Sequence, residues 1–382
     1  MPSSILRTSI TSRLASAFIL LCSIFLGIAQ ADSPQGTPEQ RLVLQLGDDS
    51  FHTRQRAQNS ILSIGPTEAI KSALQLGSLS ESVEIRLSSQ RIIARFELAI
   101  FDQQIQYLLN PRIASDSITL TGWARFSKLV GTKMSTRRAF ATLAKRYSHL
   151  LENFESNPES ILQHFGTQSL DPRVIGKNDL SRWILILFLD TETKPVYKSP
   201  MSFRILNALS HSGLCPHTKT QDELQLLSSL INAWLVSHKH VGSDQDRLVI
   251  AVRYQCQSTA HKLCKKILQS NQSTPTALAT GLLAGHALKI ENMNRYLISG
   301  CDDSRTSHVW QLIASRQTRV KTQVRDVAVA ILLHRNGHDP REYGFIEVQA
   351  DPILMYRDHS LGFRDNLSRE KTHLQARAAL GF

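Results

Sequence analysis

The sequence lacks the motifs by which common enzyme classes are recognised. None of the patterns G-x-S-x-G, H-E-x-x-H, the P-loop or G-x-G-x-x-G occurs among its 382 residues. The missing motifs leave an enzymatic function without support. We therefore predict a protein that is not an enzyme and needs no cofactor, and we rank a hydrolase with an unrecognised site third among the candidate functions.

Cysteine is scarce, at five residues. Four lie beyond the N-terminal apolar run, at Cys215, Cys256, Cys264 and Cys301. In an oxidising compartment this even number permits disulfides with three possible connectivities, and four buried free thiols are the equal alternative. On one straight helix Cys256 and Cys264 would lie about 12 Å apart, too far to bond. A break near Gln257 would make that bridge feasible.

Histidine and cysteine do not occur in the paired spacings of structural zinc sites. His211-x3-Cys215-x-His217 and Cys256-x4-His261-x2-Cys264 bring soft ligands close in sequence, without a C-x2-C or H-x3-H partner pair. We predict no metal site.

Residues 1–31 read as a cleavable secretory signal. Arg7 and Arg13 precede an apolar run over residues 14–29, and Ala29-Gln30-Ala31 is a small-residue cleavage pattern. The run is short against the ~20 residues that span a bilayer, so cleavage is favoured over an uncleaved anchor. We expect a mature start near Asp32, a periplasmic or secreted location, and no transmembrane span after cleavage.

Apolar residues recur at helical spacing nearly everywhere beyond Pro38, which predicts an all-α fold. The clearest apolar stripe includes Phe140, Leu143 and Leu151 on a helix beginning near Ser135. Further helices are predicted over 224–236, 247–256, 275–288 and 320–335, with Ser243 and Thr274 as N-caps. The apolar run 183–189 fits a buried helix better than a buried strand.

A near-repeat follows the predicted signal. Gln45-Leu46-Gly47 recurs as Gln75-Leu76-Gly77, with Arg56 matching Arg86, and a looser third copy spans 297–304. Such periods are typical of stacked helix pairs, so the sequence predicts an α-solenoid with a less regular helical middle. The predicted segments are the signal peptide at 1–31, N-terminal repeats at 32–110, an irregular middle at 111–200, C-terminal repeats at 201–345 and a capping tail at 346–382.

Four blocks of sequence carry a resemblance to known proteins. They are Leu44-x2-Gly47-Asp48-Asp49-Ser50-Phe51, Gly122-Trp123-x-Arg125-Phe126, Gln323-x-Arg325-Asp326 and Gly337-x-Asp339-Pro340-x2-Tyr343-Gly344-Phe345. The first resembles a HEAT-like (armadillo-type) repeat, and the others resemble an uncharacterised group of exported planctomycete-type bacterial proteins. The resemblance implies an α-solenoid in the cell envelope that acts as a scaffold or binds a partner, and it implies no catalytic residues.

One stretch, residues 117–151, contains basic residues and no acidic ones. The seven candidate anion- or partner-binding residues are Arg125, Lys128, Lys133, Arg137, Arg138, Lys145 and Arg146. Such a face can bind an anionic polymer, a lipid surface or an acidic protein, and simple solvation of a charged helix is the alternative. Few aromatic residues interrupt it, so nucleic acid is an unlikely partner. The paired carboxylates Asp48-Asp49 and Asp302-Asp303 are expected to serve turns and helix caps.

The leading hypothesis is a non-enzymatic exported scaffold that mediates protein–protein interaction in the envelope. The runner-up is a polyanion- or envelope-surface-binding module that uses the basic helix.

Overall fold

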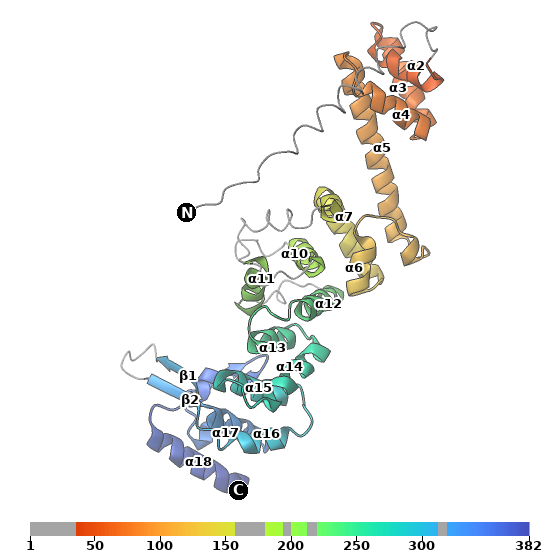
Figure 1. Ribbon diagram of the computed structural model, residues 1–382. Helices are drawn as coiled ribbons and strands as arrows, with labels where there is room; N and C mark the ends of the chain where they lie inside the picture. Colours follow the sequence, from red (N-terminus) through yellow and green to blue (C-terminus); the bar gives the residue numbers. More distant parts are fainter. Residues whose placement is uncertain (1–35, 157–179, 194–199, 212–219, 312–318, 382) are drawn as a thin grey trace, which may run out of the picture. The chain divides into compact units, whose positions relative to one another are not determined.

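A computed structural model describes residues 36–156, 180–193, 200–211, 220–311 and 319–381 (Figure 1). Within these residues the fold is predominantly α-helical, with 71% helix in 15 helices and small hairpins, which confirms the predicted helical class. The chain divides into two compact units, Met1–Gln103 and Gln104–Phe382. The predicted signal at 1–31 lies outside the described residues. No helix in the described part is both long and apolar enough to cross a membrane.

Two helix pairs make up the described part of the first unit. They are α2 (Pro38–Leu44, continued by the 3-10 turn Gln45–Gly47) with α3 (Phe51–Ile64), and α4 (Glu68–Gly77) with α5 (Val83–Leu109), which runs on into the second unit. Thr37 and Thr67 cap the first helix of each pair, each accepting a hydrogen bond from the backbone three residues on. Both pairs therefore begin with the same local device.

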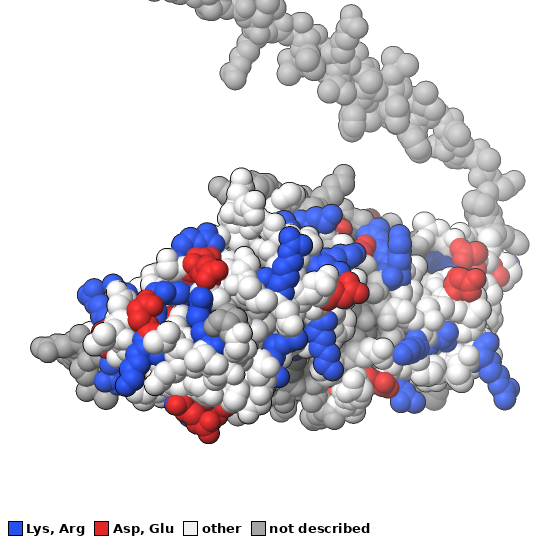
Figure 2. Space-filling model, turned by 90° about the horizontal axis from the view of Figure 1, so that it is seen from below, with Lys and Arg blue, Asp and Glu red and all other residues white. Residues whose placement is uncertain are grey.

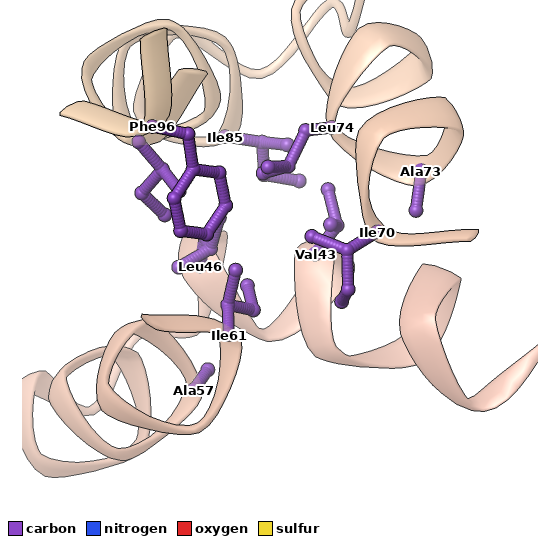
Figure 3. Close-up of a cluster of buried hydrophobic side chains, with 10 residues drawn as sticks. Val43, Leu46, Ala57, Ile61, Ile70, Ala73, Leu74, Ile85 and Phe96 are labelled. Atoms are coloured by element: carbon purple, nitrogen blue, oxygen red, sulfur yellow. The ribbon is translucent and has the colours of Figure 1, made fainter. Parts of the chain in front are cut away.

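A single hydrophobic core joins these helices (Figure 3). Side chains from all four helices point toward one another, and Ile61, Ile70 and Leu74 are fully buried. Burial of these aliphatic side chains is what holds the two pairs together, because each helix has only one apolar face.

The turns within the two pairs lie side by side. A methyl group placed on Gly47 would lie 2.5 Å from Ile85 Cγ1, and one on Gly77 would lie 2.5 Å from Val43 Cγ1. The close approach of the helices explains why glycine recurs at these two positions.

An arginine closes each turn in the same way. Arg54 donates to the carbonyl oxygens of Asp48 and Asp49, and Arg86 donates to those of Ser80 and Glu81. The structural match is thus Arg54 with Arg86, not Arg56 with Arg86 as the near-repeat aligns them. The second turn is longer than the first, which shifts the second helix of that pair along the sequence.

The second unit begins with a series of helices. They are α6 (Trp123–Val130), α7 (Met134–Ser156), α10 (Leu180–Glu192), α11 (Pro200–His211), α12 (Gln221–Ser237), α13 (Asp244–Arg253), α14 (Gln257–Gln269), α15 (Pro275–Ala287) and α16 (Met293–Gly300). A 3-10 turn (Ser115–Ser117) precedes α6. The predicted caps Ser243 and Thr274 are confirmed, and the run 183–189 is a wholly buried part of α10.

Two hairpins, two further α-helices and two 3-10 turns follow. Strands β1 (Thr306–Gln311) and β2 (Arg319–Gln323) pair antiparallel, as do β3 (Ala350–Asp351) and β4 (Met355–Tyr356). The helix α17 (Val324–Arg335) and the last helix α18 (Asn366–Leu380) pack together. Between them lie the 3-10 turns Pro340–Tyr343 and Asp358–Leu361.

Two expectations for this region were wrong. Residues 320–323, predicted as the start of a helix, belong to β2, where Val320 and Thr322 are buried and alternate with exposed neighbours as a strand requires. Asp302 and Asp303 are followed by a strand and not by a helix, so the third copy at 297–304 does not begin a helix pair like the first.

The described cysteines are buried free thiols. Cys256, Cys264 and Cys301 form no disulfide, and Cys215 lies outside the described residues. Cys256 is the N-cap of α14, so the chain does break beside it. Burial raises the pKa of Cys264 to about 12 and that of Cys301 to about 11, so neither thiol is reactive at neutral pH.

Candidate binding surfaces

Six of the seven predicted basic residues lie exposed on α6, α7 and the turn between them. These residues, which we call the basic face, are Arg125, Lys128, Lys133, Arg138, Lys145 and Arg146. The buried side of α7 carries Phe140, Leu143 and Leu151, as its apolar stripe predicts. Non-helical backbone at Tyr147 (φ −134°, ψ 28°) interrupts the helix directly after Arg146, the last residue of the basic face.

Arg137 differs from the other six because it is buried. Its side chain donates to the carbonyl oxygens of Leu108, Asn110 and Ile113, at 3.3, 2.9 and 2.9 Å, and the residue is 6% exposed. These carbonyls lie in the last turn of α5 and just beyond it, where no further helical turn satisfies them. Arg137 therefore stabilises the fold and is removed from the candidate anion-binding residues.

The surplus positive charge is confined to the second unit. Residues 104–382 contain 35 Lys and Arg against 23 Asp and Glu, whereas residues 36–103 contain 7 against 8. Figure 2 shows one face of the molecule, on which basic side chains are spread widely and acidic ones form a few small groups. A net surplus of this kind favours anionic partners for the second unit.

A second surface was not predicted, and it lies on the first unit. Five large apolar side chains at the two neighbouring turns are exposed, namely Leu44 (62%), Phe51 (62%), Leu76 (59%), Leu79 (81%) and Val83 (57%). The turns share one edge, because Gly47 approaches Ile85 and Arg54 Nε lies 3.7 Å from Glu84 Oε1. We call these five residues the turn edge.

Exposed carboxylates lie at the same two turns as the turn edge. Asp48, Asp49, Glu81 and Glu84 are exposed. Arg54 pairs with Glu84, and the arginines of both turns also donate to backbone carbonyls. The two turns therefore carry exposed apolar side chains together with these four carboxylates, which we call the acidic rim. Scattered exposed apolar residues are ordinary, but a cluster with a polar rim is typical of an interaction site.

The sequence held a signal for this surface. Phe51 and Val83 are both the first residue of a helix and follow a serine, outside the apolar stripe of the helix that they begin. A large apolar side chain at the first position of such a helix is not covered by the other helix of the same pair.

A serine, a histidine and an aspartate meet inside the second unit, but not as a catalytic triad. Ser202 donates to Asp190, at 3.2 and 2.9 Å, and not to His238, whose Nε2 lies 3.4 Å from Asp190 Oδ2. Trp234 Nε1 donates to the same carboxylate at 2.7 Å. All three members of the group are at most 3% exposed, and burial lowers the pKa of His238. This arrangement joins α10, α11 and α12 and offers no access to a substrate.

Among the described residues, no group of three or more His, Cys, Asp or Glu side chains is placed to hold a metal ion. Cys215 and His217 of the first soft-ligand segment lie outside this part of the chain.

Comparison with known proteins adds no assignment. No protein family, no curated protein and no solved structure matches the chain.

Proposed function

We propose that the chain is an exported, non-enzymatic scaffold of HEAT-like helix pairs that binds a protein partner through the turn edge. The helix-pair interpretation is supported by the shared features of the two N-terminal pairs: the threonine caps, the glycines at the turns and the arginines that bind the turn carbonyls. Export rests on the sequence pattern of residues 1–31.

The observation that carries the proposal is the composition of the turn edge. Its apolar residues are exposed on both turns, and leaving them in water forgoes the favourable free energy of burial. The acidic rim selects among partners, because like charges across an interface are repelled. The partner is therefore a protein segment with apolar side chains flanked by Lys or Arg.

Replacing two turn-edge residues should abolish partner binding without unfolding the chain. Leu79→Asp with Val83→Asp places charge at the centre of the edge, and both positions are too exposed for a large effect on stability. Leu98→Asp with Ile64→Asp, at positions 60% and 47% exposed, is the matched control. The measurement is quantitative capture of proteins from an envelope extract by the mature chain and both variants.

The proposal requires a captured protein that the turn-edge variant loses and the control retains, and whose contacting segment is apolar with Lys or Arg beside it. Equal capture by both variants would contradict it. Self-association of the chain that depends on Leu79 and Val83 would instead assign the edge to a second copy.

A second candidate function, binding of an anionic polymer or lipid surface, is supported by the basic face. Arg138→Glu with Lys145→Glu reverses two exposed charges of α7, while Arg137 is kept because it is buried. Folding should be nearly unchanged, since exposed charges contribute little to stability. We expect earlier elution from a heparin-like matrix and weaker binding to acidic-lipid vesicles at low salt.

The control is Arg91→Glu with Arg95→Glu, two exposed charges on α5 in the first unit. Binding of the wild type should also weaken as salt is raised, because the Debye screening length shortens to ~3 Å at 1 M. If the two charge-reversed variants elute at the same salt concentration, the charges of the basic face serve only to keep it solvated, and this second function is wrong.

A further inference from the structure

A hollow lies in the second unit, between the last turns of α5 and the segment that connects α5 to α6. It is open to solvent, with a volume of about 260 Å³. The described residues that line it are Gln104 and Tyr107 of α5 together with Ile113, Ser117, Ile118 and Thr119 of the connecting segment. Ligand pockets commonly measure ~300–1,000 Å³, so a hollow of this size suits a small ligand.

The connecting segment is held in place by two buried side chains. Arg137 donates to Asn110 O and Ile113 O, both at 2.9 Å, which ties the segment to α7. Trp123 Nε1 donates to Ser115 O at 3.0 Å and to Ser115 Oγ at 3.2 Å, which ties it to the start of α6. The hollow is therefore formed before a ligand arrives, and binding costs little conformational entropy.

The lining of the hollow is neutral. The described residues that form it include no Lys, Arg, Asp or Glu, and Arg112 and Asp116 of the same segment are exposed outside it. An ionised ligand would meet no opposite charge here, whereas a wholly apolar ligand would leave the polar groups of the lining without partners. The lining therefore suits a neutral ligand that carries many polar groups.

The polar groups of the hollow can both donate and accept hydrogen bonds. They are the hydroxyls of Tyr107, Ser117 and Thr119 and the side-chain amide of Gln104. Ser117 Oγ already donates to Ala114 O at 2.8 Å, so toward a ligand it serves as an acceptor. The hydroxyls of a sugar have the same dual character, and they match such a lining.

The apolar part of the hollow also fits a sugar. Tyr107 is 49% exposed, and Ile113 and the buried Ile118 lie in the same lining. A pyranose ring presents C–H groups on one face, and these pack against the negatively polarised face of an aromatic ring. Extended peptides are instead bound at strand edges, and the walls of this hollow are a helix and a segment with a 3-10 turn.

We propose that this hollow binds a neutral sugar ring, packed on Tyr107 and hydrogen-bonded by Gln104, Ser117 and Thr119. The same ring chemistry occurs in a free monosaccharide and at the end of a glycan. The lining residues belong neither to the turn edge nor to the basic face, so this site does not depend on the proposed function.

Saturation-transfer NMR titrations of the mature chain with glucose, galactose and N-acetylglucosamine test the proposal. At least one of these sugars should bind, and added salt should not weaken it, because neither the sugar nor the lining is charged. Tyr107→Ala and Gln104→Ala should each weaken binding by about tenfold, through loss of a ring contact or of a hydrogen bond. Gln106→Ala is the matched control, since Gln106 is exposed on the same helix and is not part of the lining.

Methyl glycosides of the same sugars distinguish the two sources. Equal binding of glycoside and free sugar assigns the hollow to the end of a glycan, and binding of the free sugar alone assigns it to a monosaccharide. A sugar whose binding is weakened by Tyr107→Ala and Gln104→Ala, but not by Gln106→Ala, supports the site. The proposal is overturned if none of the three sugars binds, if the three variants have equal effects, or if only an uncharged, acetylated and amidated serine–glycine peptide binds.

Discussion

Arg369→Ala should lower the free energy of unfolding by about 3–5 kcal/mol, because it leaves a buried carboxylate without its main partner. Arg369 Nε lies 3.1 Å from Asp326 Oδ1, and the two side chains are 1% and 0% exposed. His373 Nε2 is 2.9 Å from the same oxygen, and Arg369 also donates to Lys321 O at 2.7 Å. This cluster joins α18 to the start of α17. Chemical denaturation monitored by circular dichroism measures the loss.

The surface pair between the same two helices is the control. Arg325 Nη2 lies 2.7 Å from Glu370 Oε1, with side chains 20% and 59% exposed. Glu370→Ala should cost less than about 1 kcal/mol. The double variant Asp326→Leu with Arg369→Met should lower the free energy of unfolding by less than the sum of the losses in the two single variants, since it leaves neither member of the pair as an unpaired buried charge. Equal losses from Arg369→Ala and Glu370→Ala would contradict this account of α18.

Phe140→Ala should also destabilise the chain by about 3–5 kcal/mol, because it opens a cavity in the core of the second unit. The ring is fully buried, with its centroid 5.5 Å from Trp123 and 5.0 Å from Phe126. Phe126 in turn lies edge-on to Phe188 at 5.3 Å. The aromatic cluster therefore joins α6, α7 and α10, and its loss is measured by the same denaturation experiment.

Phe203→Ala provides the comparison, since Phe203 on α11 is 42% exposed. This substitution should lower the free energy of unfolding by well under half as much as Phe140→Ala, because much of the Phe203 ring is already in water. A similar loss for both phenylalanines would mean that Phe140 does not lie in a packed core.

Local sequence rules predicted much of the helical fold. The caps Ser243 and Thr274 accept hydrogen bonds from the backbone of the first turn, as serine and threonine at helix starts do. The stripe through Phe140 and Leu151 is buried, as helical periodicity requires. These features depend on residues within a few positions of one another, so the sequence alone reveals them.

The features that the sequence did not predict depend on contacts between residues that are distant in the chain. Residues 320–323 form a strand because β1 pairs with them, and no nearby residue signals that pairing. Arg137 is on the border of the apolar stripe. It is buried because carbonyl groups at the end of α5, distant in sequence, accept its hydrogen bonds. At the turn edge, the places of Phe51 and Val83 at the starts of helices are visible in the sequence, but the exposure of Leu79 depends on what the other helices leave uncovered.

The most direct test of protein binding at the turn edge is site-specific photo-crosslinking in the cell. A photoreactive amino acid is placed at Leu79, which is 81% exposed on the edge, or at Leu98, which is 60% exposed on α5 away from the two turns. We predict a discrete crosslinked protein from position 79 and none from position 98, with the crosslink mapping to an apolar segment next to Lys or Arg. The same crosslinked species from both positions, or none from position 79, would contradict a docking site at the turn edge.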